Sequence, residues 1–277
     1  MCYKVLQIQS EKNRKRLMEI VFRAKAGHIG GDLSCMNVLT TLYFKVMNTD
    51  PCNSKMVNRD RFIMSKGHCV EALYAVLEAK GFISKEMTDT LGKFKSPLAG
   101  HPTVEVPGIE VSSGALGHGL SIGVGIAIAA KMDKQSYKTY VLMGDGEQGE
   151  GSIYEAAMAG NQYKLDNLVA IIDRNKLQIS GTTESVMSLG NINERWSAFG
   201  WDVIEANGDD VDDLIRAFDE IDYNNHQPHL IIAHTTKGKG VSFMENDPKW
   251  HHGLPSPEQY LLAMSEIEQR LSILEKE

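Results

Sequence analysis

The fold of this chain is decided by residues 139–181, TYVLMGDGEQGEGSIYEAAMAGNQYKLDNLVAIIDRNKLQISG. Two apolar runs, 139–143 and 168–173, enclose a helix-like stretch, and glycine and polar residues follow each run. Apolar runs of this length, separated by a helical segment, are typical of a βαβ unit with two parallel strands. The stretch therefore predicts an α/β protein.

Two interpretations of the turn after the first run compete. Residues 144–149 have the G-x-G-x-x-G spacing of a dinucleotide-binding turn, and Asp173 lies roughly where a ribose-binding acid is expected. The same turn carries three carboxylates, Asp145, Glu147 and Glu150, where a pyrophosphate should meet bare backbone amides. An anion tolerates these carboxylates only through a bridging cation, so we prefer a metal-bridged diphosphate.

Asp145 and Asn175 are the candidate metal ligands. Both come at the end of a predicted strand, thirty residues apart, and would supply two hard oxygen atoms of the kind that Mg²⁺ prefers. Each residue also has an ordinary alternative role, Asp145 as the N-cap of a helix and Asn175 as a turn residue.

The rest of the chain continues the alternation of strands and helices. Strands are predicted at 61–65, 139–143, 168–173, 202–206 and 230–234, and helices at 10–25, 34–47, 69–80, 85–94, 114–132, 210–223 and from 256 onward. This order predicts a doubly wound, mostly parallel sheet with helices on both faces, and we expect residues 1–277 to form a single domain. The predicted helix 114–132 is rich in Gly and Ala, so another element should approach it closely.

Motif-like loops follow four of the predicted strands, at residues 65–68, 144–146, 175–177 and 237–240. Ligands of parallel α/β sheets bind beyond the carboxyl ends of the strands, where such loops meet. The four loops therefore predict one site at one edge of the sheet.

Composition narrows the class of protein. A net charge of −7 argues against nucleic acid or an anionic membrane as the main partner, because either needs a clustered basic face. The one basic cluster, Lys12–Arg16, fits the solvated face of a helix. The four cysteines have no C-x-x-C spacing, and the first fifteen residues are too polar for a signal peptide. We expect reduced thiols and a cytoplasmic location.

Several motifs together resemble the N-terminal part of transketolase. GDG followed thirty residues later by Asn looks like the signature of thiamine diphosphate enzymes. The further matches are AGHIGG (26–31), SKGHC (65–69), GHP (100–102), SSGALGHGL (112–120), KGKG (237–240) and WHHG (250–253). The similarity runs from about residue 10 to about residue 270 and follows the family order.

The resemblance assigns roles around the diphosphate. It implies that Asp145 and Asn175 bind Mg²⁺ through side-chain oxygens and Leu177 through its backbone carbonyl. It also implies that Gly146 lets the backbone approach the diphosphate and that Glu150 holds the interface with the domain that binds the other end of the cofactor. The plain alternative for Glu150 is stabilisation of a helix N-terminus.

The histidines take their expected roles from the same resemblance. His28 and His101 resemble the residues that face the donor ketose and move protons, which imidazole can do near neutral pH. His68 resembles the histidine against the cofactor diphosphate, where Lys237 adds a cation. The segment Gly114, Ala115 and Leu116 resembles the backbone that contacts the aminopyrimidine ring.

Two positions depart from the family pattern. Ile29 stands where the family usually has Pro after the histidine, which changes the rigidity of that loop. In Trp250-His251-His252-Gly253, counting from Lys237 favours His251 as the catalytic histidine, whereas anchoring on Gly253 favours His252. The remaining histidines, His118, His226, His229 and His234, we expect to be structural or at the surface.

The implied activity is ketol transfer from a ketose (phosphate) to an aldose (phosphate) through the thiamine diphosphate carbanion. The resemblance covers the first family domain alone, so we expect activity only with a separate C-terminal transketolase subunit, as an α2β2 hetero-oligomer. Substrates could be sugar phosphates or modified sugars. A subunit similar to 1-deoxyxylulose-5-phosphate synthase or 2-oxoacid dehydrogenase E1α, a nicotinamide dehydrogenase and a non-catalytic binding subunit stay open.

Overall fold

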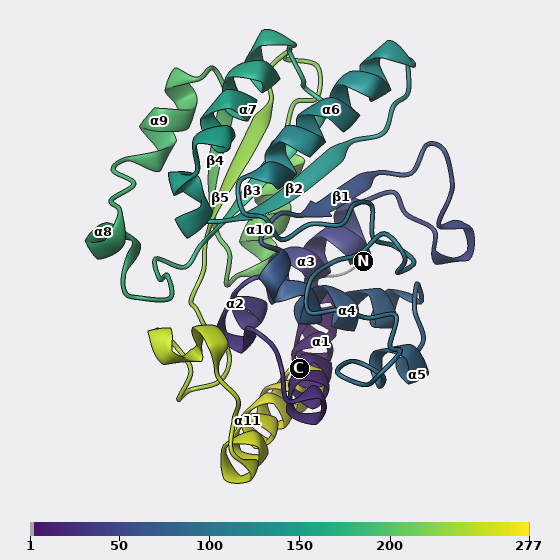
Figure 1. Cartoon of the computed structure of the whole chain (residues 1–277), viewed down its shortest axis with the longest axis vertical. Coiled ribbons are helices and arrows are strands. Elements are labelled where there is room, and N and C mark those ends of the chain that lie inside the picture. Colours follow the sequence, from purple (N-terminus) through teal and green to yellow (C-terminus); the bar gives the residue numbers. More distant parts are fainter. Residues whose placement is uncertain (1–2, 277) are drawn as a thin grey trace.

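A computed structural model describes residues 3–276, which are built around one sheet of five parallel strands (Figure 1). The strands lie in the order β1-β2-β3-β5-β4. Their bounds are β1 Arg61–Met64, β2 Thr139–Gly144, β3 Leu168–Arg174, β4 Asp202–Asn207 and β5 His229–His234. All five predicted strands are confirmed, and so is the parallel α/β class.

Helices cover both faces of the sheet. The α-helices are α1 Tyr3–Ala24, α2 Ile29–Ser34, α3 Met36–Thr41, α4 Val70–Lys80, α5 Lys85–Thr88, α6 His118–Met132, α7 Gly151–Gln162, α8 Thr183–Val186, α9 Ile192–Ala198, α10 Val211–Asp219 and α11 Pro257–Lys276. A π-helical turn spans Leu42–Val46, and 3₁₀ turns span Pro51–Asn53, Gly67–Cys69, Gly146–Gly149 and Pro248–His252. Across residues 3–276, no helix has the length and apolarity needed to cross a membrane.

Except for the edge strand β4, the strands are buried on both faces because neighbouring residues point into different cores. Val141 belongs to the core shared with α6, α7 and α9, whereas Leu142 belongs to the core shared with α1, α3, α4 and α10. In β3, Ala170 and Ile171 divide in the same way. Near-continuous apolar strands are therefore required, which is why the sequence shows runs rather than alternation.

Four predicted helices have limits that differ from the structure. The helix expected from residue 114 begins at His118, because Gly114 and Gly117 have φ of 138° and 85°. The helix expected over 85–94 ends at Thr88, followed by turns that include Gly92 at φ 80°. The helix expected over 34–47 is divided into α3 and the π-helical turn that follows, and its first residue, Ser34, is the last of α2. The helix expected over 210–223 ends at Asp219.

The small residues of α6 do allow close approach, as predicted. A Cβ atom on Gly119 would lie 2.9 Å from the backbone Cα of Ser65, and one on Gly123 would lie 2.6 Å from Val141 Cγ2. Both distances are too short, so these two glycines are needed for α6 to sit on the β1 loop and on β2. By contrast, a Cβ on Gly125 of the same helix would have no neighbouring atom within 4 Å.

We expect Gly119→Ala to destabilise the protein by about 1–3 kcal/mol, the usual cost of forcing an extra methyl group into a packed site. Gly125→Ala is the matched control, and it should stabilise the same helix by up to about 1 kcal/mol. Urea unfolding of the two variants measures the difference. Equal stabilities would show that the close contact between α6 and the β1 loop does not matter.

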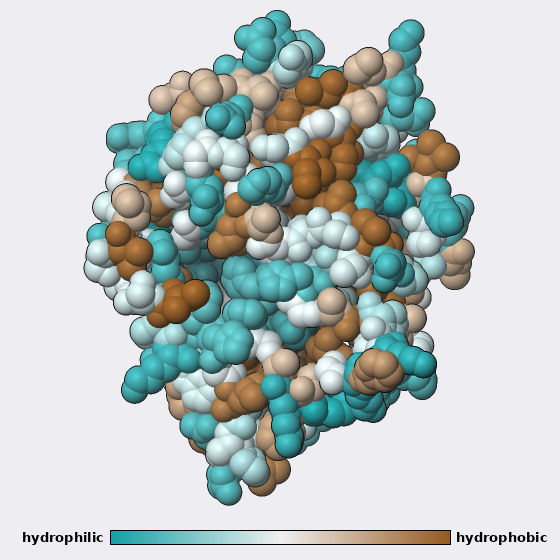
Figure 2. Space-filling view, viewed as in Figure 1, coloured by the Kyte–Doolittle hydropathy of each residue, from teal (hydrophilic) through white to brown (hydrophobic). Residues whose placement is uncertain are grey.

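The outer face of α6 and α7 is apolar and exposed. Ile122, Gly125, Ala129 and Met132 form one exposed stripe on α6, and Met158 is 54% exposed on α7. Figure 2 shows apolar residues gathered over the position that α6 has in Figure 1. We call these five residues the α6–α7 face.

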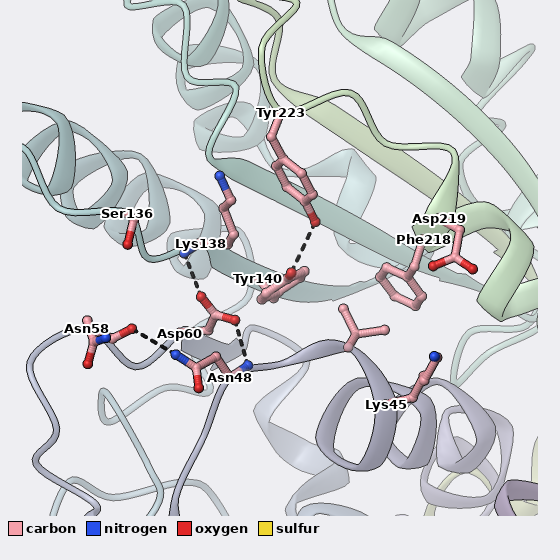
Figure 3. Close-up of a pocket in the computed structure, with 11 residues that line it drawn as sticks. Lys45, Asn48, Asn58, Asp60, Ser136, Lys138, Tyr140, Phe218, Asp219 and Tyr223 are labelled. Carbon is pink, nitrogen blue, oxygen red and sulfur yellow. Dashed lines mark hydrogen bonds between the residues drawn. The ribbon is translucent and has the colours of Figure 1, made fainter. Parts of the chain in front are cut away.

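A cavity of about 410 Å³ lies at the opposite, amino-terminal edge of the sheet (Figure 3). Its polar groups mostly bond to each other. Asp60 accepts hydrogen bonds from the backbone N–H groups of Asn48 and Lys138, and the hydroxyls of Tyr140 and Tyr223 lie 3.1 Å apart. These bonds tie the turn before β1 to the start of β2, so we interpret this cavity as structural.

Candidate active site

The loops that follow the strands enclose a cavity of about 480 Å³ at the carboxyl edge of the sheet. Its walls come from the loops after β1, β2, β3 and β5, together with the loop before α2 and the segments around residues 101 and 114. A cavity of this size suits a small-molecule ligand. The four motif loops predicted to meet at one edge do meet there.

Most of the predicted site residues line this cavity. They are His28, His68, His101, Gly114, Leu116, Asp145, Gly146, Glu150, Asn175, Leu177, Lys237 and His251. Ala115 and His252 are the two that do not, although the His252 ring lies 4.7 Å from the His28 ring. Of the two tail histidines, His251 is thus the one on the cavity wall.

Asp145 places a buried carboxylate on the cavity wall. It accepts hydrogen bonds from the backbone N–H of Gly146 at 2.8 Å and of Lys176 at 2.5 Å, and Arg174 approaches it at 3.4 Å. Burial, together with the nearby carboxylate of Asp173, raises the pKa of Asp145. A cation bound beside this carboxylate would relieve both effects.

Asn175 and Leu177 supply two further oxygen atoms next to Asp145. The Asn175 Oδ1 atom accepts a hydrogen bond from the Leu177 N–H at 3.1 Å, and its Nδ2 atom donates to Asp173 at 3.2 Å. The Leu177 carbonyl accepts from Lys237 Nζ at 3.3 Å, so this carbonyl already meets a positive charge. The donor set of carboxylate, amide and carbonyl oxygens fits Mg²⁺ with diphosphate.

Protein side chains alone do not complete a metal site here. Within residues 3–276, no group of three or more His, Cys, Asp or Glu side chains is arranged to hold a metal ion. Mg²⁺ commonly takes only one or two protein carboxylates and fills its remaining positions with phosphate oxygens and water. The residues present therefore fit a metal that arrives with a phosphorylated ligand.

Glu147 is one of the three carboxylates near the expected diphosphate position. In the structure it bonds to protein groups, a role that the sequence analysis missed. Its carboxylate accepts hydrogen bonds from Ser65 Oγ, from the Gly117 N–H at 2.8 Å and from the Gly144 N–H at 2.9 Å. These bonds satisfy the charge with groups of three different loops. Glu147 therefore joins the loops rather than repelling an anion in the cavity.

Lys66 is a second residue that sequence reasoning missed, although it stands in the SKGHC motif. It lines the cavity, is 1% exposed, and forms an ion pair with Asp173, which is completely buried. Because Asp173 is buried and paired with Lys66, it cannot bind the ribose of a dinucleotide. The dinucleotide interpretation is therefore left without the ribose-binding acid that it requires.

Lys237 adds a second amino group to the cavity. Its Nζ atom lies 2.7 Å from Nδ1 of His251. Burial, with the charge of Lys66 nearby, lowers the pKa of Lys237 to about 8. Two lysines on one wall favour an anionic ligand such as a diphosphate.

Histidines form the rim of the cavity around His28. The ring of His28 lies 5.2 Å from that of His68, 6.5 Å from that of His101 and 5.7 Å from that of His251. Burial and the neighbouring imidazoles lower the pKa of His28 to about 4 and lower that of His101. The Nδ1 atom of His28 is buried and has no hydrogen-bond partner among the described residues. Neutral imidazoles with free nitrogen atoms can bind hydroxyl groups and transfer protons.

Two glycines let the loops under the rim approach each other. A Cβ atom on Gly67 would lie 2.8 Å from the Cα of Gly114, and Gly114 itself has φ of 138° with the His101 ring beside it. The loop after β1 and the segment that carries Gly114 therefore meet directly, next to His101.

Glu150 lines the cavity at its exposed outer edge, where α7 begins. Its Cβ atom would lie 2.6 Å from a Cβ on Gly117. This position leaves the carboxylate accessible to whatever covers the cavity.

Fold and site together define a class of protein. A parallel α/β sheet with carboxylate, amide and carbonyl oxygens, two lysines and a rim of histidines at its carboxyl edge describes a protein that holds a phosphorylated cofactor. Residues 7–266 match the family described as the thiamine diphosphate binding domain of transketolase. The chain belongs to this family and is a transferase-type subunit.

Curated relatives agree with the family assignment. The chain is 73% identical over 272 residues to one subunit of an apulose-4-phosphate transketolase from Phocaeicola vulgatus, covering 98% of this chain and 97% of that one. It is 39% identical to a 6-deoxy-6-sulfo-D-fructose transketolase subunit from Clostridium sp., over 95% and 96% of the two chains. Human transketolase is 37% identical over 92% of this chain and 41% of its own.

Solved transketolases share the fold. The structure of transketolase from Campylobacter jejuni superposes with a TM-score of 0.87 at 28% identity, covering all of this chain and 48% of that one. Transketolase from Leishmania mexicana gives a TM-score of 0.84 at 26% identity, with 46% of that chain covered. The present chain thus spans about half the length of these solved enzymes.

Proposed function

We propose that this chain is the diphosphate- and Mg²⁺-binding subunit of a two-subunit transketolase. The enzyme would transfer a two-carbon ketol unit from a ketose phosphate to an aldose phosphate. The observation that carries the proposal is the carboxyl-edge cavity, in which Asp145, Asn175 and Leu177 lie beside two lysines and below a rim of histidines. Thiamine diphosphate, when bound, supplies the carbanion that accepts and then donates the two-carbon unit.

The chain's own residues would hold the charged end of the cofactor. Asp145, Asn175 and the Leu177 carbonyl would bind Mg²⁺, and Lys237 and His68 would bind diphosphate oxygens. Gly114, Ala115 and Leu116 would contact the ring that extends toward the partner subunit. Gly146 carries no side chain that would stand between the backbone and the diphosphate.

The rim histidines would bind the donor sugar and move protons. His28 and His101 would hydrogen-bond the donor hydroxyl and carbonyl groups, and His251 would stand beside His28, with the two rings 5.7 Å apart. Their lowered pKa values keep His28 and His251 neutral at physiological pH, so each ring offers one donor and one acceptor nitrogen. His252, beside His28 but outside the cavity wall, would support the His28 ring.

We expect His101→Ala to reduce kcat/KM of the two-subunit enzyme by about 100-fold or more, the usual scale for removal of an acid–base group. Binding of thiamine diphosphate with Mg²⁺ should stay unchanged, because His101 lies on the rim. His226→Ala, at an exposed histidine paired with Asp166, is the matched control. An unchanged rate for His101→Ala would remove this residue from the catalytic set.

A separate C-terminal transketolase subunit would complete the site, in an α2β2 assembly. The α6–α7 face supports this proposal, because an exposed apolar surface of this kind is typical of an interaction site. Gly151, at the start of α7, leaves room for another element, since a Cβ there would meet nothing within 4 Å. Glu150 stands at the same edge, where it would contact the covering subunit.

The proposed substrate class is sugar phosphates, with apulose 4-phosphate as the first candidate donor. The support is the 73% identity to a subunit named for that substrate over nearly the whole of both chains. A relative named for a sulfo-sugar is only 39% identical. Xylulose 5-phosphate would be the donor if the enzyme served the pentose phosphate pathway instead.

A cytoplasmic location belongs to the proposal as well. Cys35, Cys52 and Cys69 are free thiols, as expected in a reducing compartment. Cys2 lies outside the described residues.

The test is ketol transfer measured on this chain alone and on the chain co-expressed with its partner subunit, with Mg²⁺ and thiamine diphosphate. The donors are apulose 4-phosphate and xylulose 5-phosphate, and the acceptor is ribose 5-phosphate or a shorter aldose phosphate. We expect turnover by the pair only, and faster with apulose 4-phosphate. Full activity of the single chain would contradict the two-subunit proposal.

A further inference from the structure

Asp173 is the most heavily hydrogen-bonded carboxylate of the site, yet it does not line the cavity. Its Oδ2 atom accepts from Ser34 Oγ at 2.6 Å, from Asn175 Nδ2 at 3.2 Å and from Lys66 Nζ. Its Oδ1 atom accepts from Thr235 Oγ1. The four donors come from α2 and from the loops after β1, β3 and β5.

The bond to Asn175 determines which atom of that amide faces the cavity. A carboxylate paired with a lysine can only accept hydrogen bonds, so the amide atom that faces Asp173 has to be the NH₂ group. The oxygen atom, Oδ1, therefore points to the opposite side, toward the N–H of Leu177. If the amide were reversed, it would present an NH₂ group to a metal ion, and NH₂ is not a ligand.

We propose that Asp173 is a positioning residue that orients Asn175 as a metal ligand. This inference rests on the proposed function, since it takes Asn175 to be a ligand of Mg²⁺. Hydrogen-bonded partners of metal ligands fix ligand orientation, and their loss typically lowers metal affinity about 10–100-fold. Asp173 acts in this way from a position that neither the metal nor the substrate touches.

Asp173 also connects the metal loop to the histidine rim. Lys66 Nζ, held by Asp173, donates to the Gly31 carbonyl at 3.2 Å, and Ser34 Oγ, whose hydrogen is shared with Asp173, lies 2.9 Å from the same carbonyl. If Asp173 were only a structural counter-ion for Lys66, that role would explain the contacts with Lys66 and Ser34. It would not explain the hydrogen bond from Asn175. The metal dependence of cofactor binding separates the two roles.

The test compares variants in a background that leaves no unpaired buried cation. Lys66→Met is the reference, and Lys66→Met with Asp173→Ala removes the acceptor for Asn175. Lys66→Met with Asp173→Asn keeps an acceptor oxygen at the same place. For each purified protein with its partner subunit, Mg²⁺ is titrated at fixed thiamine diphosphate, and binding is followed by calorimetry. Circular dichroism confirms folding, and the single variant Asp173→Asn, nearly the same shape as the wild type, is measured in parallel.

We expect the Ala double variant to need about 10–100-fold more Mg²⁺ than Lys66→Met for half-maximal cofactor binding. Saturating Mg²⁺ should restore binding, and the Asn double variant should lie in between. Single Asp173→Asn keeps an acceptor oxygen and should stay near the wild type. If the double variants do not fold, the single variant Asp173→Leu, which has no acceptor oxygen, takes their place, and an unchanged Mg²⁺ requirement in it would overturn the inference.

Asn175→Ala distinguishes failure of this inference from failure of the proposed site. If Asn175→Ala raises the Mg²⁺ requirement while the Asp173 variants do not, Asp173 is structural and the metal assignment stands. If Asn175→Ala also leaves the requirement unchanged, or if the wild type binds the cofactor without Mg²⁺, both the metal assignment and the role of Asp173 are overturned.

Discussion

Asp145→Ala is expected to abolish Mg²⁺-dependent binding of thiamine diphosphate while the protein stays folded. Removing a direct ligand should cost at least about 100-fold in affinity, since outer partners of ligands alone are worth about 10–100-fold. The fold should tolerate the change, because burial and the nearby Asp173 already raise the pKa of the Asp145 carboxyl. Alanine removes that unfavourable charge. Calorimetric titration with and without Mg²⁺ measures the binding.

The control for this variant is Asp133→Ala, at an exposed aspartate just after α6. It should bind cofactor like the wild type. If Asp145→Ala still bound thiamine diphosphate in a Mg²⁺-dependent way, Asp145 would be a helix cap and not a ligand. A variant that lost its fold would point to a structural role, and thermal unfolding would reveal it.

Glu71→Gln is expected to make the protein more stable at alkaline pH, by several kcal/mol. Glu71, in the first turn of α4, is 1% exposed, and its Oε2 atom has no hydrogen-bond partner among the described residues. Burial and the neighbouring Cys69 raise the pKa of Glu71 from 4.5 to about 8. The other facing acid is Asp32 of α2, whose pKa is also raised by burial and by Glu71, and Lys66 partly offsets this rise.

The sign of the effect follows from proton binding. Because the folded protein holds the Glu71 proton more tightly than the unfolded chain, stability is full below about pH 4.5 and declines as the pH rises toward 8. One pKa unit corresponds to about 1.4 kcal/mol, so the wild type should lose roughly 4–5 kcal/mol across that range. Glutamine does not titrate, so the variant should not show this loss.

Urea unfolding at pH 5.5, 7 and 8.5 measures this difference, with Glu155→Gln at an exposed glutamate as the control. The gap between Glu71→Gln and the wild type should widen with pH. Parallel pH profiles for the two proteins would mean that Glu71 is not a proton-holding buried acid.

The strands of the sheet could be predicted from the sequence, because each strand is recognised from its own residues. A strand buried on both faces must be apolar along its length, so four of the five runs could be recognised by themselves. The edge strand β4 is only partly buried and carries Asp202 and Glu205. Helix limits were less predictable where glycine conformation decided them. Gly117 at φ 85° and Gly92 at φ 80° end or delay helices that periodicity alone would extend.

The site residues that stand in sequence motifs could be predicted. Those whose roles depend on contacts with residues distant in the sequence could not. Asp145 and Asn175 were found from their spacing, and the Gly-His loops from their resemblance to the family motifs. Glu147 was visible only as an unexplained carboxylate, because its partners Ser65 and Gly117 are distant in sequence. A signal for Glu71 existed, since it is a charged residue in the first turn of a helix, directly before the apolar run 72–77.

The choice between His251 and His252 shows the same limit. Adjacent residues cannot be separated by counting, because a one-residue change in a loop reverses which side chain faces inward. The 3₁₀ turn Pro248–His252 directs His251 to the cavity wall, where it meets Lys237.

The central claim is that the cavity at the carboxyl edge holds thiamine diphosphate through a divalent cation. The most direct measurement is calorimetric titration of the chain, together with its partner subunit, with thiamine diphosphate, in Mg²⁺ and after chelation, with NAD as the competing ligand. We expect binding of thiamine diphosphate that requires Mg²⁺ and no binding of NAD. Binding of NAD, or binding of thiamine diphosphate that is indifferent to the metal, would contradict the account.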